Sequence, residues 1–150
     1  DVNKFVSREI RRNNKYDAII MDPPSYGRGA KGEVWQFENN ISDLIELCEK
    51  VLSDNPLFFL INSYTTGISA EVLSNLLRLN LKKYKGKITS GEIGLPMKNS
   101  ELILPCRNIW KMGKINSYKL YETRKKIYKN NNKSFCISFL AFYKQNKTNK

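Results

Sequence analysis

The chain has 150 residues, which is enough for one compact domain or for a large part of one. Hydrophobic residues make up 41%, charged residues 27% and aromatic residues 11%. This composition is typical of a soluble globular protein and excludes collagen-like, coiled-coil and disulfide-scaffold chains. The net charge of +12 indicates a polyanionic partner. The longest apolar runs, at 57–61 and 135–143, are far shorter than the ~20 residues that cross a bilayer, so no membrane span is predicted.

The chain contains no histidine, and its three cysteines show no CxxC spacing. This pattern argues against a structural zinc site and predicts no metal. It also excludes the Ser–His and Cys–His nucleophiles of common hydrolases. Because the sequence starts at Asp1 without a methionine or a signal peptide, we expect an N-terminally incomplete chain from a reducing cytoplasm.

The excess positive charge is concentrated near the C-terminus. Residues 1–110 contain 15 Lys and Arg against 13 Asp and Glu, a balance of +2. Residues 111–150 contain 11 Lys and Arg against Glu122 alone, a balance of +10. We therefore divide the chain into a folded part, 1–111, and a basic Lys- and Asn-rich extension, 112–150.

Elements alternate along the first part of the chain. The pattern predicts a short helix at Asn3–Arg12 and a strand at Tyr16–Met21 that is buried on both faces. Asp22–Pro24 ends this strand because proline cannot donate a ladder hydrogen bond. An amphipathic helix at Ile41–Ser53 and a second buried strand at Leu57–Ile61 follow. The order strand, helix, strand predicts a parallel βαβ unit.

A third helix is predicted at Ser69–Leu81, with Ser69 as its N-cap. The residues expected on its buried face are Val72, Leu73, Leu76 and Leu77. Two extended stretches, Lys87–Leu95 and Glu101–Lys111, predict an antiparallel hairpin. The last apolar run, Phe135–Tyr143, is either one more strand or part of an appendage with no fixed role.

A glycine-rich stretch, Gly27–Gly32, matches the pattern GxGxxG. In a dinucleotide-binding fold the first glycine directly follows the strand, whereas here Asp22–Tyr26 intervenes. A phosphate-binding P-loop is excluded because Glu33 follows Gly32. We predict a mobile basic loop beside the site. Trp35 and Phe37 either cover a substrate pocket or staple the following helix, and the second interpretation is favoured.

The run Asp22-Pro23-Pro24-Ser25-Tyr26 is the most informative motif, because ligands of open α/β sheets bind at the carboxyl ends of strands. Two prolines restrict the backbone, so a carboxylate and neighbouring carbonyls are held toward one ligand atom. Such acceptors suit an amino or ring N–H group whose lone pair attacks an electrophile. The alternative is a proline-rich turn in which the aspartate is only a cap.

The motif and its surroundings resemble class I S-adenosylmethionine-dependent methyltransferases, in particular bacterial large-subunit rRNA methyltransferases. The resemblance covers about residues 1–110. It implies a Rossmann-like methyltransferase sheet, of which this chain holds the later strands and an antiparallel C-terminal hairpin. The segments that carry the resemblance are Lys4-Phe5-Val6, Arg8-Glu9, Tyr16-Asp17, Asp22–Gly29, Lys31–Trp35 and Leu104-Pro105-Cys106.

This resemblance implies methyl transfer from S-adenosylmethionine to a base of RNA. Asp22 and the Pro23 carbonyl would position the acceptor nitrogen, Pro24 would complete the motif, and Tyr26 would stack on the extruded base. The resemblance also aligns Asp1 with an acid at the cofactor adenine. The residues expected at RNA phosphates are Arg28, Lys31 and Arg107.

Two alternatives stay open. Cys106, with Arg107 beside it, suggests a cytosine-5 mechanism in which a thiolate attacks the ring. Related cytosine methyltransferases place that cysteine where this chain reads Asn62-Ser63-Tyr64-Thr65, which favours a core or hairpin role for Cys106. The other alternative is a non-catalytic RNA-binding module that retains only the later half of the fold.

Overall fold

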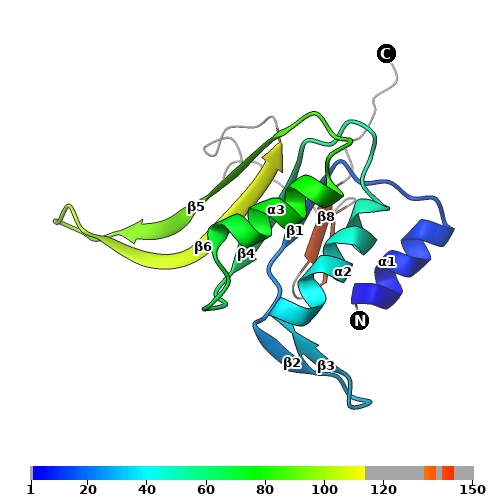
Figure 1. The fold of residues 1–150 in the computed structure, drawn as a ribbon, viewed down its shortest axis with the longest axis horizontal. Coiled ribbons are helices and arrows are strands. Elements are labelled where there is room, and N and C mark those ends of the chain that lie inside the picture. Colours follow the sequence, from blue (N-terminus) through cyan, green and yellow to red (C-terminus); the bar gives the residue numbers. More distant parts are fainter. Residues whose placement is uncertain (1, 114–133, 138–139, 144–150) are drawn as a thin grey trace.

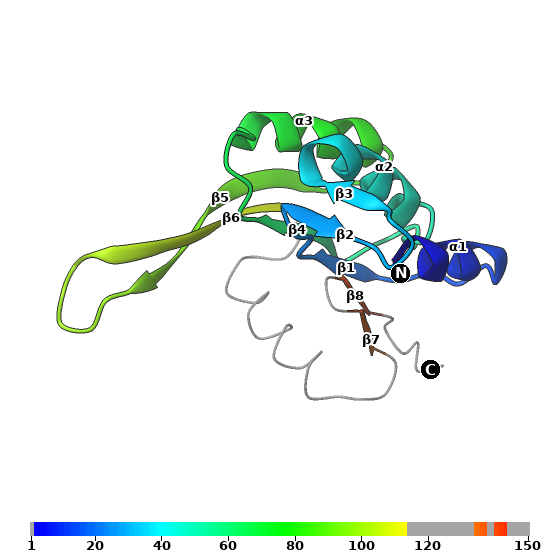
Figure 2. The ribbon, with the colours of Figure 1, turned by 90° about the horizontal axis from the view of Figure 1, so that it is seen from below.

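The computed structural model describes residues 2–113, 134–137 and 140–143, with side chains for 2–104 and 108–113. Its main sheet has the strand order β5-β6-β4-β1-β8-β7 (Figures 1 and 2). The central strands β1 (Ala18–Met21) and β4 (Phe58–Ser63) run parallel, with Ala18 opposite Phe58 and Met21 opposite Ile61. Both strands are buried along their whole length. The α/β class and the two buried strands that the sequence predicted are therefore confirmed.

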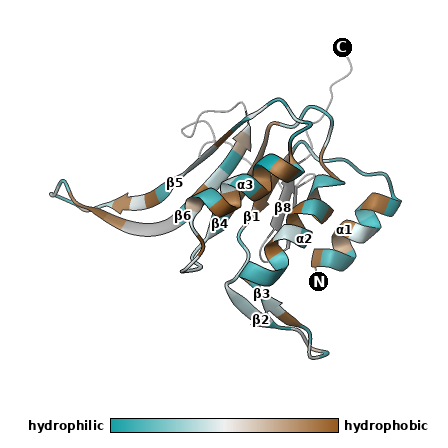
Figure 3. Cartoon of the chain, in the orientation of Figure 1, coloured by the Kyte–Doolittle hydropathy of each residue, from teal (hydrophilic) through white to brown (hydrophobic). Residues whose placement is uncertain are grey.

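Helices α2 and α3 cover one face of the sheet (Figure 2). Helix α2 (Phe37–Glu49) connects β1 to β4 and completes the predicted parallel βαβ unit. It begins four residues before the predicted start at Ile41, because Phe37 is fully buried and joins the apolar face of the helix. Helix α1 (Val2–Arg11) packs against α2. Figure 3 shows hydrophobic and hydrophilic residues alternating along these helices, as expected of amphipathic helices.

The two faces of the central strands build two apolar clusters. On the helix side, Ile19 and Met21 of β1 join Phe59 and Ile61 of β4 in the main core. On the other face, alternate residues of the same strands form a second cluster. This alternation follows from the strand period of two residues. The second cluster consists of Ala18, Ile20, Phe58 and Leu60, with Leu57 and Ile109 packed against it.

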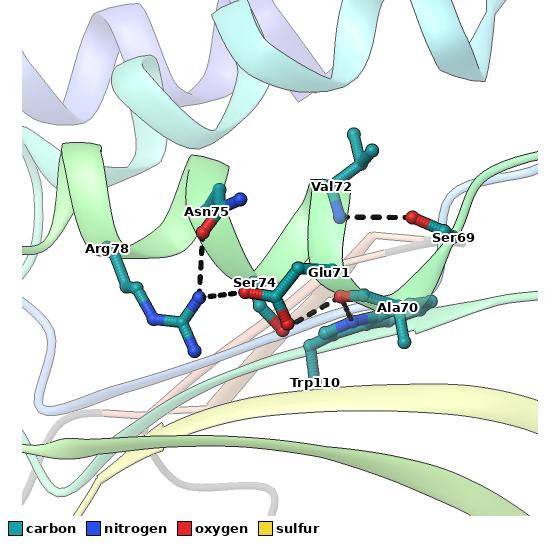
Figure 4. Close-up of polar contacts among 8 residues, drawn as sticks. All are labelled: Ser69, Ala70, Glu71, Val72, Ser74, Asn75, Arg78 and Trp110. Carbon is teal, nitrogen blue, oxygen red and sulfur yellow. Dashed lines mark hydrogen bonds and ion pairs between the residues drawn. The ribbon is translucent and has the colours of Figure 1, made fainter.

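Helix α3 (Ala70–Asn80) begins as predicted after Ser69, whose side chain accepts a hydrogen bond from the Val72 backbone N–H at 3.3 Å (Figure 4). Leu73 and Leu77 are fully buried, but Val72 is 53% exposed, so its predicted burial is wrong. Figure 4 shows the reason: Val72 lies on the side of the helix away from Trp110, which packs beneath it.

Strands β5 (Lys87–Pro96) and β6 (Ile103–Gly113) form the predicted antiparallel hairpin. Its distal part extends well beyond the body of the protein (Figures 1 and 2). Strand β6 pairs antiparallel with β4, so the hairpin continues the main sheet. The predicted boundary between residues 111 and 112 lies within β6.

The C-terminal apolar run contains two short strands, β7 (Ser134–Ile137) and β8 (Leu140–Tyr143). They pair with each other, and β8 pairs antiparallel with β1. The sequence allowed two alternatives for this run, one more strand or part of an appendage. The structure instead shows two strands in the sheet. Within the described ranges no helix is long and apolar enough to span a membrane.

A buried carboxylate fixes helix α1 to the start of the sheet. Glu9 is 4% exposed and accepts hydrogen bonds from Tyr16 Oη at 2.6 Å, Asn14 Nδ2 at 2.7 Å and Arg12 NH1 at 3.2 Å. The Tyr16 hydrogen bond, together with those of Asn14 and Arg12, lowers the pKa of Glu9 despite its burial. Burial and the Glu9 contact raise the pKa of Tyr16.

Removing the hydroxyl in Tyr16→Phe is therefore expected to lower the free energy of unfolding by about 1.5–3 kcal/mol, because a buried ionised acceptor loses its shortest partner. Urea unfolding at pH 7 measures this loss.

The stability should also depend on pH through Glu9. The pKa of Glu9 is lower in the folded than in the unfolded protein, so its contribution to the free energy of unfolding is complete above the unfolded pKa and is lost as the pH falls through the folded pKa. The acid-induced loss should shrink in Glu9→Gln. Glu46→Gln, which breaks the exposed Lys50 pair, is the control, with a change of about 0.5 kcal/mol or less.

Candidate functional site

The candidate site lies where the parallel strands β1 and β4 end side by side. The last residues paired between β1 and β4 are Met21 and Ile61. Asp22 and Asn62 are the next residue on each strand. Asp22 is partly buried and Pro23 is buried. The two following loops are joined because Thr65 Oγ1 donates a hydrogen bond to Ser25 Oγ at 2.9 Å. The structure thus brings the predicted motif and the end of β4 together at one sheet edge.

The carbonyls of the two prolines differ in their partners. Trp35 Nε1 donates a hydrogen bond to the Pro24 carbonyl at 2.7 Å, which fixes the loop against the next strand. No described hydrogen bond uses the Pro23 carbonyl. Of the two carbonyls, that of Pro23 is therefore the one left to accept a hydrogen bond from a ligand. Phe37, by contrast, is in the core, in keeping with its predicted role in the helix.

The glycine-rich stretch, which the sequence predicted to be a loop, belongs to a hairpin. Strands β2 (Tyr26–Arg28) and β3 (Val34–Gln36) form a small antiparallel hairpin. The turn is closed by the Gly29 N–H, which donates to the Glu33 carbonyl at 2.8 Å. Gly32 has a φ of +84°, a conformation that favours glycine. Gly29 and Gly32 therefore serve a tight turn, in agreement with the rejection of GxGxxG as a dinucleotide-binding motif.

The β2–β3 hairpin carries three predicted contact residues. Tyr26 is 50% exposed, and the Arg28 Nε donates to its hydroxyl at 2.8 Å. The Arg28 guanidinium lies 6.0 Å from the centroid of the Tyr26 ring. Lys31 is exposed, and its backbone N–H donates to the Glu33 carboxylate at 3.0 Å. The Glu33 backbone N–H and that of Lys31 together lower the pKa of Glu33. The hairpin thus presents an aromatic ring with cations beside it.

Three predicted residues are not placed at the level of side chains. Asp1 lies outside the described residues, as do the side chains of Cys106 and Arg107. The backbone of β6 shows where the last two belong: Asn108 pairs with Ser63, so Cys106 and Arg107 come just beyond the carboxyl end of β4.

Two residues at this edge were not recognised as candidates. Asn62 is 2% exposed, and its Oδ1 is buried without a hydrogen-bond partner. Tyr64 is 55% exposed on the loop after β4. The signal for Asn62 was a polar residue that directly follows the apolar run Leu57–Ile61. No such signal marks Tyr64.

The oxygen atoms at the edge determine which ligands it suits. The Asp22 carboxylate, the Pro23 carbonyl and the Asn62 Oδ1 are all acceptors, and they suit N–H donors or a cationic group. The described residues include no cluster of His, Cys, Asp and Glu that could hold a metal ion.

No family model and no curated protein matches the sequence of this chain. Solved structures do match. A SAM-dependent methyltransferase from Agrobacterium tumefaciens is similar over 75% of this chain, with a TM-score of 0.65 and 29% identity. The chain has a Rossmann-like methyltransferase fold. A second crystal structure, of a protein described as a methyltransferase in complex with SAH, matches over 75% of this chain with a TM-score of 0.57 and 19% identity.

The chain spans only part of these methyltransferases, 38% of the first and 30% of the second. The shared fold places Asp22 at the carboxyl edge of a parallel strand, which is where open α/β sheets bind their ligands.

Proposed function

We propose that this chain is the acceptor-binding part of an S-adenosylmethionine-dependent methyltransferase that modifies a base of RNA, specifically large-subunit rRNA, in the cytoplasm. The observation that carries the proposal is the position of Asp22 and Pro23, which directly follow β1 where it lies parallel to β4 in a fold shared with methyltransferases. The rRNA assignment is supported by the sequence resemblance and by the basic extension.

The residues at the edge would act by orientation. When bound, S-adenosylmethionine supplies an electrophilic methyl group on a sulfonium. The Asp22 carboxylate and the Pro23 carbonyl would accept the N–H groups of the base, so that the nitrogen lone pair points at that methyl. Such a transfer depends on proximity and alignment more than on a strong base, so the absence of histidine is no obstacle.

Aromatic and cationic groups support a nucleotide acceptor. Tyr26, at the start of β2, and Tyr64, on the loop after β4, are half exposed. Each is next to a residue of the Ser25–Thr65 hydrogen bond. An extruded base stacks well on such rings, and stacking tolerates any base. Arg28 and Lys31 lie on the same hairpin as Tyr26 and would contact the adjoining phosphates.

The proposal is tested by methyl transfer from tritiated S-adenosylmethionine to unmodified ribosomal RNA, with the complete gene product that contains this chain. We expect label in 23S-type RNA and none in a matched transfer RNA. Cofactor binding without label in any RNA would refute the proposed RNA methyltransferase activity. RNA binding without cofactor binding would instead favour a non-catalytic RNA-binding module.

A second prediction concerns the basic extension. Residues 114–133 contain seven Lys and Arg and one Glu, and we expect them to bind RNA phosphates. Replacing these seven with Gln should weaken RNA binding and reduce the slope of log K against log salt, because fewer counterions are released. Fluorescence anisotropy between 50 and 200 mM salt measures both quantities. Over this range of salt, the loss of several phosphate contacts has a large effect on the affinity.

A control that replaces Lys82, Lys83 and Lys85, before β5, should leave the slope nearly unchanged. Equal slopes for wild type and the seven-residue variant would contradict the prediction.

A further inference from the structure

The search for further sites leads to Asn62. Among the described residues, it is the buried polar side chain with an atom that lacks any hydrogen-bond partner. The other buried polar groups with known contacts are satisfied: Glu9 has three donors, Ser63 Oγ accepts from the Thr65 N–H at 3.0 Å, and Ser74 Oγ donates to the Ala70 carbonyl at 2.8 Å. A buried acceptor without a partner is costly and calls for an explanation.

The register shows which way Asn62 faces. It lies opposite Ile109 of β6, which packs with Ile20 and Leu60 on the sheet face away from the helices. Residues alternate along a strand, so Asn62 follows Leu60 on that face, and Asp22 follows Ile20. The Asn62 amide and the Asp22 carboxylate therefore end the same face of neighbouring strands.

The carboxyl ends of β1 and β4 therefore carry three acceptors: the Asp22 carboxylate, the Pro23 carbonyl and the buried Asn62 Oδ1. The Watson–Crick edges of the four RNA bases differ in their N–H donors. Adenine and cytosine each present one amino group, and uracil presents one ring N–H. Guanine presents an amino group and the adjacent ring N–H, which together match three acceptors.

We propose that the base is guanine, that Asn62 accepts its N1–H, and that the exocyclic N2 amine held by Asp22 and Pro23 receives the methyl group. This inference deepens the proposed function and rests on it. Asn62 acts as a positioning and specificity residue, because it holds the atom next to the reacting one. The amide oxygen also disfavours a base that places an acceptor at the same point, since two acceptors would face each other.

The transfer balances without a further reagent. The N2 lone pair forms the new N–C bond while the S–C bond of the sulfonium breaks, and that electron pair stays on sulfur as S-adenosylhomocysteine leaves. The surplus proton passes from the nitrogen to the Asp22 carboxylate and then to water.

The experiment uses the complete gene product, tritiated S-adenosylmethionine and RNA that carries either guanosine or 2-aminopurine at the target. 2-Aminopurine keeps the 2-amino group but has no N1–H. The wild type should label N2 of guanosine and use 2-aminopurine at least 10-fold less efficiently, measured as kcat/KM. In Asn62→Leu, kcat/KM for guanosine should fall at least 10-fold, and the two substrates should become nearly equivalent. Because Leu removes an unpaired buried acceptor, the Tm of this variant should stay the same or rise.

The controls separate specificity from stability. Ser74→Ala removes a satisfied buried hydroxyl on α3 and should leave the preference for guanosine unchanged. If Asn62→Leu does not fold, Asn62→Ala tests the same loss of the acceptor. Label in adenosine, cytidine or uridine would overturn the guanine assignment and leave the proposed function standing. An unchanged 2-aminopurine penalty in the Asn62 variants would overturn the assignment of Asn62 as the acceptor of N1–H. No label in any RNA would remove the proposed function and this inference together.

Discussion

In the complete gene product, Asp22→Ala should reduce kcat for methyl transfer by about 10²–10³-fold, the usual effect of losing one preorganised polar group at a reacting centre. Asp22 lies at the carboxyl end of β1 beside the Pro23 carbonyl, and its proposed partner is the methyl-accepting base. The affinity for S-adenosylmethionine should therefore change little, as calorimetric titration would show. Retained turnover in Asp22→Ala would contradict the assignment of this residue to the acceptor.

Asp17 provides a matched control at the opposite end of the same strand. Its Oδ1 accepts a hydrogen bond from Ser53 Oγ at 2.8 Å, at the amino end of β1. Asp17→Ala should lower stability but leave turnover per folded molecule close to that of the wild type. If both aspartate variants lost activity equally, the effect of Asp22→Ala would reflect folding and not chemistry.

The same reaction tests the cytosine-5 alternative. A nitrogen acceptor forms no covalent bond to the enzyme, so Cys106→Ala should keep its activity. Loss of activity in Cys106→Ala, or covalent trapping of the enzyme by RNA that contains 5-fluorocytosine, would favour the thiolate mechanism.

Trp110→Ala should have the largest effect on stability, a decrease of about 3–5 kcal/mol in the free energy of unfolding. Trp110 is 1% exposed, and its Nε1 donates to the Ala70 carbonyl at 2.7 Å (Figure 4). The side chain therefore joins β6 to the first turn of α3, and its removal creates a cavity between the helix and the sheet. Chemical denaturation at neutral pH measures the loss.

Two further variants make this measurement specific. Trp110→Phe keeps most of the buried volume and should lose less, because the Ala70 carbonyl still accepts from Ser74 Oγ at 2.8 Å. Leu79→Ala, on the same helix but 69% exposed, should change the stability by about 0.5 kcal/mol or less. A small effect of Trp110→Ala would show that α3 is held to the sheet by other contacts.

The sequence by itself determined those features that depend on local pattern. Continuous apolar runs located β1 and β4, because strands covered on both faces carry apolar residues at every position. Ser69 marked the start of α3 through a bond to a backbone N–H only three residues away. The sequence also predicted that β1 ends at Asp22–Pro24, because a proline cannot donate a ladder hydrogen bond wherever the strand lies in the sheet.

Only the tertiary structure decided the features that depend on contacts distant in sequence. The burial of Phe37 extended α2 toward its N-terminus, and the turn at Gly32 became a hairpin because β2 pairs with β3. The exposure of Val72 followed from the direction in which α3 packs on Trp110. Asn62 became a candidate only when the register placed it beside Asp22 and its Oδ1 proved to have no partner. A sequence lists donors and acceptors, but the chain must fold before it is decided which acceptor is buried and left unpaired.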